Sequence, residues 1–597
     1  MREYEYIVVG SGAGGGPLAA NLAKSGCRVL LLEAGSDPET YLYQVPCFHA
    51  YSTEEKAMAW DYFVHHYSKD EARDPKYRAD RGGVFYPRAG TLGGCTAHNA
   101  MITVYPHESD WNHIASLTGD ESWSASNMWQ YFQRLENCAY ADIGDASRSG
   151  HGFDGWLTTS TVDPTMAIGD EQIMGTVIDA ALRGGCAGII ERIFSRRKLH
   201  YDPNDKRNIG AEGLTSRIPL ATRNGKRNGT REYIRRVQKE HPDNLDVRMN
   251  HLVTRVLFEG DRAVGVECLE GQHLYQADPD YAGGSQPSTR EYRCTREVIL
   301  AGGAFNTPQL LMLSGIGPKA HLEEKGVVCR VDRAGVGRNL QDRYEVGVVT
   351  TTKREFEMLR GATFKPPADG ELGDECFQEW LKGVGMYTSN GAVVALVTKS
   401  KSSKSDPDLF LFALPGNFHG YYPGYSADIE RRKNFLTWAI IKAHTNNTNG
   451  EVRLVSNDPR ERPYINFHYF DESNDTSGED LDAVVNAVLL VRQMNKRNEA
   501  LAEELMPGGT VPNDREEIAK WVADNAWGHH ASCSCRMGTP DDPLAVVDSR
   551  FRVIGTQGLR IVDASVFPRI PGFFIVTPIY MISEKATDAI LADRARL

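Results

Sequence analysis

The chain has 597 residues and a mass of 66.3 kDa, which favours two domains over one simple core. Apolar residues make up 41% and charged residues 24%, as is ordinary for a globular protein. The formal net charge is −12 and no tract is strongly basic, which argues against a nucleic acid or an anionic membrane as the main partner.

The sequence gives no sign of export or of membrane insertion. Its eleven cysteines are scattered without a regular framework, and their odd number favours reduced thiols. Residues 1–10 lead straight into an apolar strand, with no signal-peptide core. No segment reaches the roughly twenty apolar residues that a membrane-spanning helix needs. We therefore expect a cytoplasmic protein with neither a membrane nor a nucleic acid as partner.

The first glycine-rich segment has the pattern of a dinucleotide-binding unit. A short apolar run ends in Gly10-Ser-Gly12-Ala-Gly-Gly15, a helical pattern follows, and a second apolar run ends at Glu33. Gly10 permits a tight turn, Gly12 lets backbone N–H groups approach a pyrophosphate, and Gly15 lets the helix and strand pack closely. Glu33 stands where a carboxylate accepts from ribose hydroxyls. The unit predicts dinucleotide binding, and both NAD and FAD fit it.

Three further segments distinguish between these cofactors. Residues 88–101 form a glycine-rich loop that leads to His98-Asn99. Residues 298–317 read as a strand, a glycine turn and a helix with a proline in its first turn. Residues 558–565 read as a buried strand that ends in Asp563. With these segments in this order, the chain resembles the glucose–methanol–choline (GMC) oxidoreductases from Tyr6 to about Ala592.

The resemblance implies the fold class, the cofactor and the reaction. It implies an α/β protein with a Rossmann-like FAD-binding domain and a second, α+β substrate domain built on a mostly antiparallel sheet. The FAD-binding domain would comprise residues 1–160, 215–330 and 522–597, and the substrate domain residues 161–214 and 331–521. The reaction would be oxidation of an alcohol to a carbonyl compound, by hydride transfer to flavin N5.

Carried over position by position, the resemblance also implies the residues that hold FAD. They are Gly10, Gly12, Gly15, Glu33, Gly90, Gly94, His98, Asn99, Val253, Asp563 and Ala564. Val253 would contact adenine through its backbone, and the loop 90–99 would wrap the isoalloxazine ring and the pyrophosphate. Asp563 and Ala564 would reach the ribityl–pyrophosphate region.

The loop around His98 most resembles the choline oxidase version of the family's loop. There the matching histidine is joined covalently to the C8 methyl group of the flavin. Such a bond would raise the flavin potential and ease hydride acceptance. In the alternative interpretation, His98 only hydrogen-bonds near the dimethylbenzene edge. The covalent bond is the favoured expectation.

A run near the C-terminus, Trp527-Gly-His-His-Ala-Ser-Cys-Ser-Cys-Arg-Met-Gly-Thr539, permits a metal site, a nucleophile or a base. Zinc sites prefer longer spacings between their ligands, so we expect no metal. A cysteine nucleophile lacks a nearby acid and an acyl substrate. The resemblance implies a catalytic histidine at a fixed distance before Met537-Gly538, which selects His530 as the proton acceptor. His529 would then line the substrate pocket.

The chain departs from the family at the second active-site position. Most relatives carry Asn or His there, whereas an alignment anchored at Pro571 puts Phe574 at this place. A phenyl ring neither donates nor accepts the hydroxyl proton. Either His530 works alone, or His529 or Thr577 substitutes, or the chemistry differs. The different chemistries would be light-driven decarboxylation of a carboxylate, or flavin binding without catalysis.

Two interpretations of the substrate remain open. Trp60 and Glu345, at positions that face the substrate in relatives, would together make a cation site. An apolar or aromatic alcohol would instead suit a pocket lined by Phe573 and Phe574. The electrons would pass to oxygen or to a quinone-like acceptor, and the chain would be a monomer or a homodimer.

Overall fold

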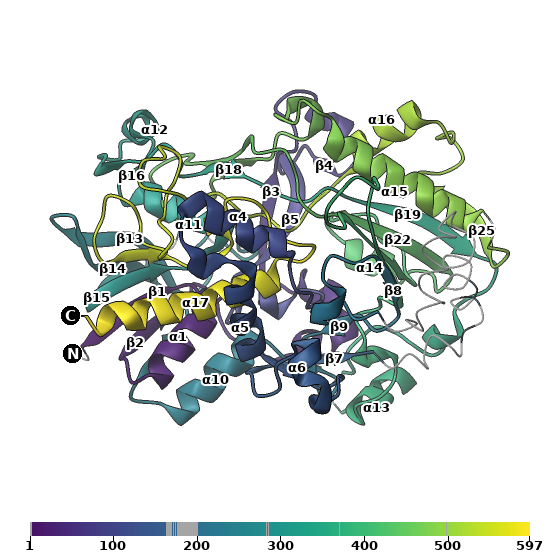
Figure 1. The fold of residues 1–597 in the computed structure, drawn as a ribbon, viewed down its shortest axis with the longest axis horizontal. Helices are drawn as coiled ribbons and strands as arrows, with labels where there is room; N and C mark the ends of the chain where they lie inside the picture. Colours follow the sequence, from purple (N-terminus) through teal and green to yellow (C-terminus); the bar gives the residue numbers. More distant parts are fainter. Residues whose placement is uncertain are drawn as a thin grey trace.

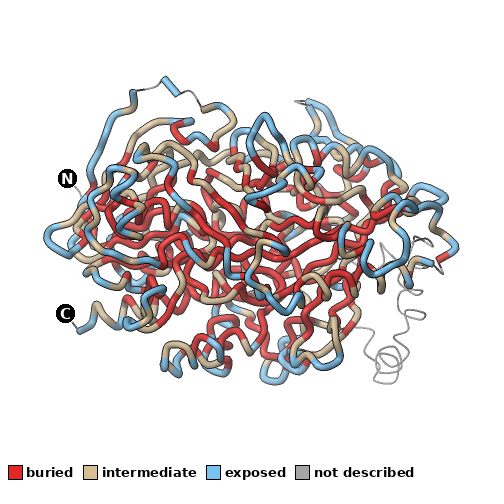
Figure 2. The backbone as a smooth tube through the Cα atoms, turned by 90° about the horizontal axis from the view of Figure 1, so that it is seen from above, coloured by how far each residue is buried: buried red, intermediate tan, exposed pale blue. Residues whose placement is uncertain are grey.

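The computed structural model describes residues 3–162, 170, 172, 175, 201–281, 283–284, 286–368, 370–496 and 498–596. Of the segment 161–214, which the sequence assigns to the substrate domain, residues 163–169 and 176–200 lie outside this description. Both termini lie at the same end of the molecule (Figure 1). Buried backbone runs through the middle of the fold, and exposed backbone is concentrated at its rim (Figure 2).

A seven-stranded sheet contains the N-terminal glycine-rich unit. Its spatial order is β12 (Leu245–Arg248), β2 (Val29–Leu32), β1 (Tyr4–Val9), β15 (Ser288–Leu300), β14 (Arg262–Glu270) and β13 (His251–Glu259), with β26 (Leu559–Ile561) also beside β15. The strands from β12 to β15, and β26, pair in parallel, whereas β14 and β13 are antiparallel. The long β15 joins both parts, because residues 288–293 pair with β14 and residues 294–300 with β1. The parallel part is the predicted Rossmann-like core.

Helices pack beside the parallel strands. They are α1 (Gly15–Lys24), α10 (Thr230–Glu240), α11 (Gly303–Leu313) and α17 (Val576–Arg594). Helix α1 packs against both α10 and α17, side by side at the end of the molecule that holds the termini (Figure 1). Leu18 and Leu22, one turn apart on α1, are fully buried in this contact layer. Within the described ranges, no helix is both long and apolar enough to cross a membrane.

A second, six-stranded sheet forms the other half of the molecule. Its spatial order is β25 (Leu501–Met506), β19 (Glu345–Thr352), β22 (Phe435–Lys442), β21 (Leu409–Leu414), β20 (Val394–Thr398) and β8 (Gly213–Thr215). All neighbours pair antiparallel, as the sequence predicts for this part of the chain. Helix α15 (Glu479–Asn495) packs on β19, β21 and β22. Because every residue of β22 is buried, this strand is covered on both faces.

The run that contains the two histidines connects the two sheets. At its start, Trp527 and Glu345 exchange two main-chain hydrogen bonds, each of 3.0 Å, at the beginning of β19. At its end, the N–H groups of Cys533 and Cys535 donate to the carbonyl oxygens of Ala564 and Ser565, just after β26. The histidines are therefore held between the substrate-side sheet and the carboxyl end of a Rossmann strand, which is where α/β sheets bind ligands.

Candidate active site

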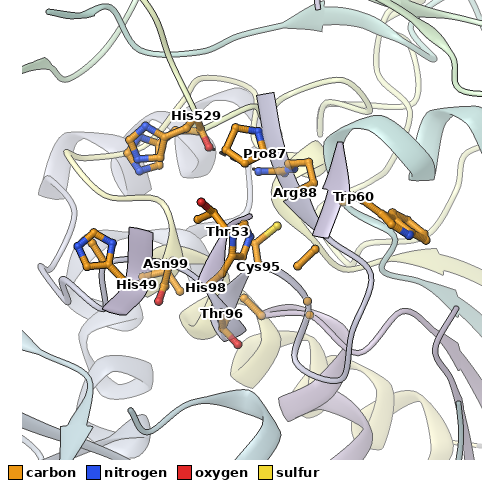
Figure 3. Close-up of a pocket in the computed structure, with 18 of the residues that line it drawn as sticks. His49, Thr53, Trp60, Pro87, Arg88, Cys95, Thr96, His98, Asn99 and His529 are labelled. Atoms are coloured by element: carbon orange, nitrogen blue, oxygen red, sulfur yellow. Dashed lines mark hydrogen bonds between the residues drawn. The ribbon is translucent and has the colours of Figure 1, made fainter. Parts of the chain in front are cut away.

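A cavity of about 390 Å³ lies between these elements. Most of the residues that the sequence assigns to the cofactor and the substrate line it: Gly10, Gly12, Glu33, Trp60, Gly94, His98, Asn99, Val253, Glu345, His529, His530, Asp563, Ala564 and Phe574. Gly15, Gly90 and Phe573 stand outside its wall. Segments from across the chain therefore meet in one site (Figure 3).

The three glycines of the first turn serve different spatial needs. Gly10 has a φ of 99°, and a Cβ there would lie 2.4 Å from the oxygen of Ala301. A Cβ on Gly15 would lie 2.1 Å from the oxygen of Gly10, so this glycine lets α1 pack against the turn. A Cβ on Gly12 would meet no atom within 4 Å. The open backbone at Gly12, on the cavity wall, provides the close approach that a pyrophosphate needs.

Two buried acids mark the carboxyl ends of parallel strands. Glu33 follows β2 and accepts hydrogen bonds from the N–H (3.1 Å) and the hydroxyl (2.5 Å) of Ser11. Burial raises the pKa of Glu33, and the bonds from Ser11 and Gly35 oppose this rise. Asp563 follows β26 and accepts from the N–H of Gly303 (2.8 Å) at the start of α11. Each acid is thus fixed at the edge where the ribose and phosphate groups of a dinucleotide would lie.

His98 carries an unsatisfied nitrogen inside the cavity wall. Its Nδ1 is buried and has no hydrogen-bond partner among the described residues. Burial, with Arg227 and Arg88 nearby, lowers the pKa of His98 to about 3, so the ring is neutral. The neighbouring Asn99 is held by Arg227, whose Nη1 donates to its carbonyl oxygen (2.7 Å) and to its Oδ1 (2.8 Å). Because a buried polar atom without a partner is costly, this loop fits a cofactor that completes it.

His529, His530 and Glu345 converge at another part of the wall. Oε1 of Glu345 lies 3.3 Å from Nδ1 of His529 and 3.3 Å from Nδ1 of His530. The two imidazole centroids are 3.9 Å apart. The main chain of His530 is fixed by its N–H, which donates to Oδ1 of Asp342 (2.8 Å). Since both Nδ1 atoms face Glu345, the Nε2 edges are left for a ligand in the cavity.

Burial sets the protonation of this cluster. Burial, with Arg343 as the next cause, lowers the pKa of His529 to about 3. Burial, the neighbouring ring and Arg343 lower the pKa of His530 well below its ordinary value. Burial also raises the pKa of Glu345, against the opposing charge of Arg343. Both imidazoles are therefore neutral at neutral pH, the form that can accept a proton.

The two consecutive phenylalanines face different spaces. The ring of Phe574 lines the cavity, with its centroid 6.0 Å from that of His530 and the two planes at 85°. Phe573 instead packs on His107 (5.0 Å between centroids) and Phe410 (5.4 Å), beside a separate small pocket. The expectation that Phe573 lines the substrate pocket is corrected, because neighbouring residues of this loop point in different directions.

Both residues of the predicted cation site line the cavity. The indole of Trp60 lies over Gly90, where an added Cβ would be 2.3 Å from its Nε1. Figure 3 shows Trp60 and His529 on opposite sides of Arg88. Glu345 is 2% exposed and lies against the histidines. The cation site stays a prediction.

His529 and His530 form, with Glu345, a group of three side chains whose ligand-type atoms lie within 4.8 Å of one another. Cys533 and Cys535 are fully buried, and the ligand-type atoms that gather near the histidines belong to Glu345, not to these cysteines, within the part of the chain that the structure describes. Thr577 is buried and stands outside the cavity wall, so it is not placed to replace the missing helper.

Sequence reasoning missed several residues of this cavity or its wall: Arg88, His49, Tyr421 and Asp342. Nη1 of Arg88 lies 3.5 Å from the carbonyl oxygen of His529, and no carboxylate of the described chain lies within ion-pair distance of this guanidinium. The ring of Tyr421 meets that of His529 edge-on, with centroids 5.2 Å apart. Only Arg88 carried a sequence signal, because an arginine beside a glycine-rich loop is suited to an anionic ligand. The others lie in segments with no pattern.

Sequence models of a single family match most of this chain. One model with the description GMC oxidoreductase matches residues 4–345, and a second with the same description matches residues 446–583. The chain belongs to the GMC oxidoreductase family. This GMC oxidoreductase is an FAD-dependent enzyme, and the open backbone at Gly12 and the unsatisfied nitrogen of His98 fit that cofactor.

Individual relatives support the same family and fold. An oxygen-dependent choline dehydrogenase of Vibrio vulnificus is 30% identical over 597 residues, which cover 99% of this GMC oxidoreductase and 95% of the relative. A formate oxidase variant of Aspergillus oryzae superposes with a TM-score of 0.79, at 21% identity and with 100% and 99% of the two chains covered. A pyridoxine 4-oxidase from Mesorbium loti gives a TM-score of 0.74, at 21% identity and 99% coverage of both chains. These solved structures share the fold.

Proposed function

We propose that this GMC oxidoreductase oxidises an alcohol to a carbonyl compound, with His530 as the residue that takes the hydroxyl proton. The observation that carries the proposal is the placement of two neutral imidazoles on the cavity wall with their Nδ1 atoms against Glu345. This placement leaves Nε2 of His530 as a proton acceptor towards the cavity. A positioned base of this kind typically contributes about 10²–10⁴ in rate.

FAD, when bound, supplies the two-electron acceptor for the hydride. The residues that would hold it are the turn at Gly10 and Gly12, the two strand-end acids Glu33 and Asp563, and the loop 90–99. Val253 and Ala564 would complete the adenine and ribityl ends of the site. His98, which lines the cavity and whose Nδ1 has no hydrogen-bond partner among the described residues, would be joined covalently to the flavin. Protein denatured and filtered should then retain its yellow colour, and a colourless protein fraction would contradict the bond.

An apolar or aromatic alcohol is the substrate class that the lining favours. Beside the histidines, the wall is built from aromatic rings: Phe412, Phe418, Tyr421, Tyr425 and Phe574. The carboxylate that a cationic alcohol would need, Glu345, is turned towards the histidines. An aromatic ring packs well against other rings, at centroid distances of about 4.5–7 Å. The choline specificity of relatives therefore need not extend to this cavity.

Several further properties belong to the same proposal. The chain would divide into an FAD-binding part (residues 1–160, 215–330 and 522–597) and a substrate part (residues 161–214 and 331–521), and the presence of two separate sheets supports this division. The ten cysteines in the described ranges are all free thiols, which supports a cytoplasmic protein. Oxygen or a quinone-like compound would reoxidise the flavin, and the protein would act as a monomer or a homodimer.

Anaerobic mixing with a panel of alcohols tests the proposal. Benzyl-type and long-chain primary alcohols should bleach the flavin absorbance faster than choline does. Repeating the reaction with oxygen or with a quinone-like dye then separates an oxidase from a dehydrogenase. Failure of every alcohol in the panel to reduce the bound flavin would refute the proposed reaction.

A further inference from the structure

We propose that Glu345 is a positioning residue that holds both histidines in one tautomer, so that His529 becomes the second active-site partner which Phe574 cannot be. The inference rests on the proposed alcohol oxidation and adds to it a role for the acid and for the second imidazole. It starts from the shared contact of one carboxylate oxygen, Oε1, with two Nδ1 atoms at 3.3 Å each.

The position of Glu345 relative to the histidines is set by the main chain. Glu345 opens β19 and exchanges both of its main-chain hydrogen bonds with Trp527, two residues before His529. Asp342, three residues earlier, accepts from the N–H of His530. The same short stretch of chain thus holds the histidines at two points. The carboxylate meets them because of this pairing, not through a long flexible reach.

Oε1 of Glu345 and the Nδ1 atoms of His529 and His530 have no hydrogen-bond partner among the described residues, so the carboxylate acts on the two rings through its charge at 3.3 Å. A carboxylate oxygen beside Nδ1 favours the tautomer with hydrogen on Nδ1, and this leaves the lone pair on Nε2. Because one oxygen faces both rings, both rings take the same tautomer. Both Nε2 atoms are then acceptors towards the cavity. The proton passes from the alcohol oxygen to Nε2 of His530 as the O–H bond breaks and the N–H bond forms. Nε2 of His529, whose ring centroid is 3.9 Å from that of His530, is the second acceptor available to the same hydroxyl.

The guanidinium of Arg343 favours an ionised Glu345, against the effect of burial and of Asp342. The titratable or charged groups that face it and the two rings are Arg88, Arg343, Asp342, His49 and Tyr421. Neither Arg88 nor Arg343 has a carboxylate partner at ion-pair distance among the described residues, so the ionised forms of Asp342 and Glu345 balance two guanidinium charges. When Nε2 of His530 takes a proton, the imidazolium gains a carboxylate beside its other N–H, which stabilises it.

Burial acts against the ionised form of Glu345. Burial and Asp342 raise its pKa, while Arg343 and the Trp527 indole act in the opposite direction. The positioning role therefore rests on the contact geometry and not on this shift. A cationic substrate would instead compete with both histidines for Oε1 of Glu345. The side chain of Glu345 is only 3% exposed.

The test compares Glu345→Gln with Glu345→Asp in the FAD-containing enzyme. The amide of Glu345→Gln is neutral and cannot stabilise the imidazolium as a carboxylate does, so the anaerobic rate of flavin reduction should fall about 100-fold. The KM for the alcohol should change little, and the solvent deuterium isotope effect should rise, because breaking the O–H bond becomes slower. Glu345→Asp keeps a carboxylate and should recover part of the loss. Glu584→Gln, which alters another buried acid, bonded to Asn21 and Trp156, should keep the wild-type rate.

Carbethoxylation with diethyl pyrocarbonate gives a second readout that needs no turnover. The reagent attacks an unprotonated imidazole nitrogen that carries a lone pair, so Nε2 of both rings should react in the wild-type protein. In Glu345→Gln, the peptide that contains His529 and His530 should be modified more slowly, as measured by mass spectrometry. If no alcohol reduces the wild-type flavin, the proposed function fails while this readout still tests Glu345. Modification at the wild-type rate, or a loss confined to the KM of cationic alcohols, would overturn the role of Glu345.

Discussion

The phenyl ring of Phe574 stands edge-on to the imidazole of His530, with centroids 6.0 Å apart and planes at 85°. At this position the ring offers no hydrogen bond to a substrate hydroxyl. It is also packed against Phe410 (5.0 Å between centroids), a residue of β21 in the substrate-side sheet. The position that the family resemblance assigns to a polar helper is therefore part of an aromatic wall, and in the proposed reaction the histidine pair forms the hydrogen bonds to the substrate hydroxyl.

Replacing Phe574 tests whether a polar side chain at this position would help the histidines to bind the substrate hydroxyl. Phe574→Asn should destabilise the fold by roughly 3–5 kcal/mol, because it removes a buried ring and leaves amide groups to be satisfied. It should also raise the rate of flavin reduction by small polar alcohols, since an amide beside His530 can bind the hydroxyl. Thermal unfolding and anaerobic stopped-flow absorbance measure the two effects. Phe574→Leu is the matched control, with a loss of packing and no gain in rate. A faster Phe574→Leu enzyme would show that space, not hydrogen bonding, limits the reaction.

Replacing His530 by alanine should affect flavin reduction differently from replacing His529. His530→Ala removes the proton acceptor and should slow flavin reduction by about 10²–10⁴-fold. His529→Ala should keep more of the maximal rate and should change the preference among alcohols, because its ring contacts Tyr421 in the substrate wall. Stopped-flow reduction with several alcohols separates these effects. Full-rate reduction by His530→Ala would refute the assigned base.

Lowering the pH below about 6.5, the ordinary pKa of histidine, should destabilise the folded protein. Burial is the main cause that lowers the pKa of His49 and His444 to about 4, from an ordinary value of 6.5. Between these values the unfolded chain binds protons that the folded chain does not. The free energy of unfolding should therefore fall as the pH falls from 6.5 towards 4, by up to about 1.4 kcal/mol per pH unit for each such histidine.

Urea unfolding at a series of pH values measures this slope. His49→Asn keeps a donor for the carbonyl oxygen of Asn390, which the ring nitrogen now contacts at 3.1 Å, and removes one titrating group. In this variant, the slope of the unfolding free energy against pH should decrease between pH 4 and 6.5, by the amount that corresponds to about one proton fewer taken up on unfolding. A free energy of unfolding that does not depend on pH between 4 and 6.5 would contradict the neutral, buried state of these rings.

Alanine substitutions at two glycines of the first turn should affect FAD binding and folding differently. A Cβ at Gly15 would meet the oxygen of Gly10 at 2.1 Å, so Gly15→Ala should cost at least about 3 kcal/mol of stability. A Cβ at Gly12 would meet nothing within 4 Å, so Gly12→Ala should fold normally. It should nevertheless bind FAD at least about tenfold more weakly, because the methyl group occupies the approach to the backbone. FAD content and melting temperature of both variants measure the contrast, and normal FAD affinity in Gly12→Ala would place the pyrophosphate elsewhere.

The dinucleotide unit could be predicted from the sequence because its determinants are local. The turn at Gly10, the helix after Gly15 and the acid at Glu33 follow one another within a single strand–helix–strand unit, and the structure has them in that arrangement. Short-range spacing and backbone conformation carry this kind of information without knowledge of distant partners. For the run before Met537, the family resemblance and not the spacing by itself selects His530.

The roles of Glu345, Trp60 and Phe573 were decided by tertiary structure. Each of these residues has a side chain that suits a substrate pocket, yet only long-range pairing settles where it points. The pairing of Glu345 with Trp527 turns the acid towards the histidines, and the bend of the loop at Phe573 turns that ring away from the cavity. The sequence by itself determined the cofactor unit and, through the family resemblance, the candidate base, whereas the packing of the two sheets around one cavity determined which acid, which ring and which second histidine lie beside that base.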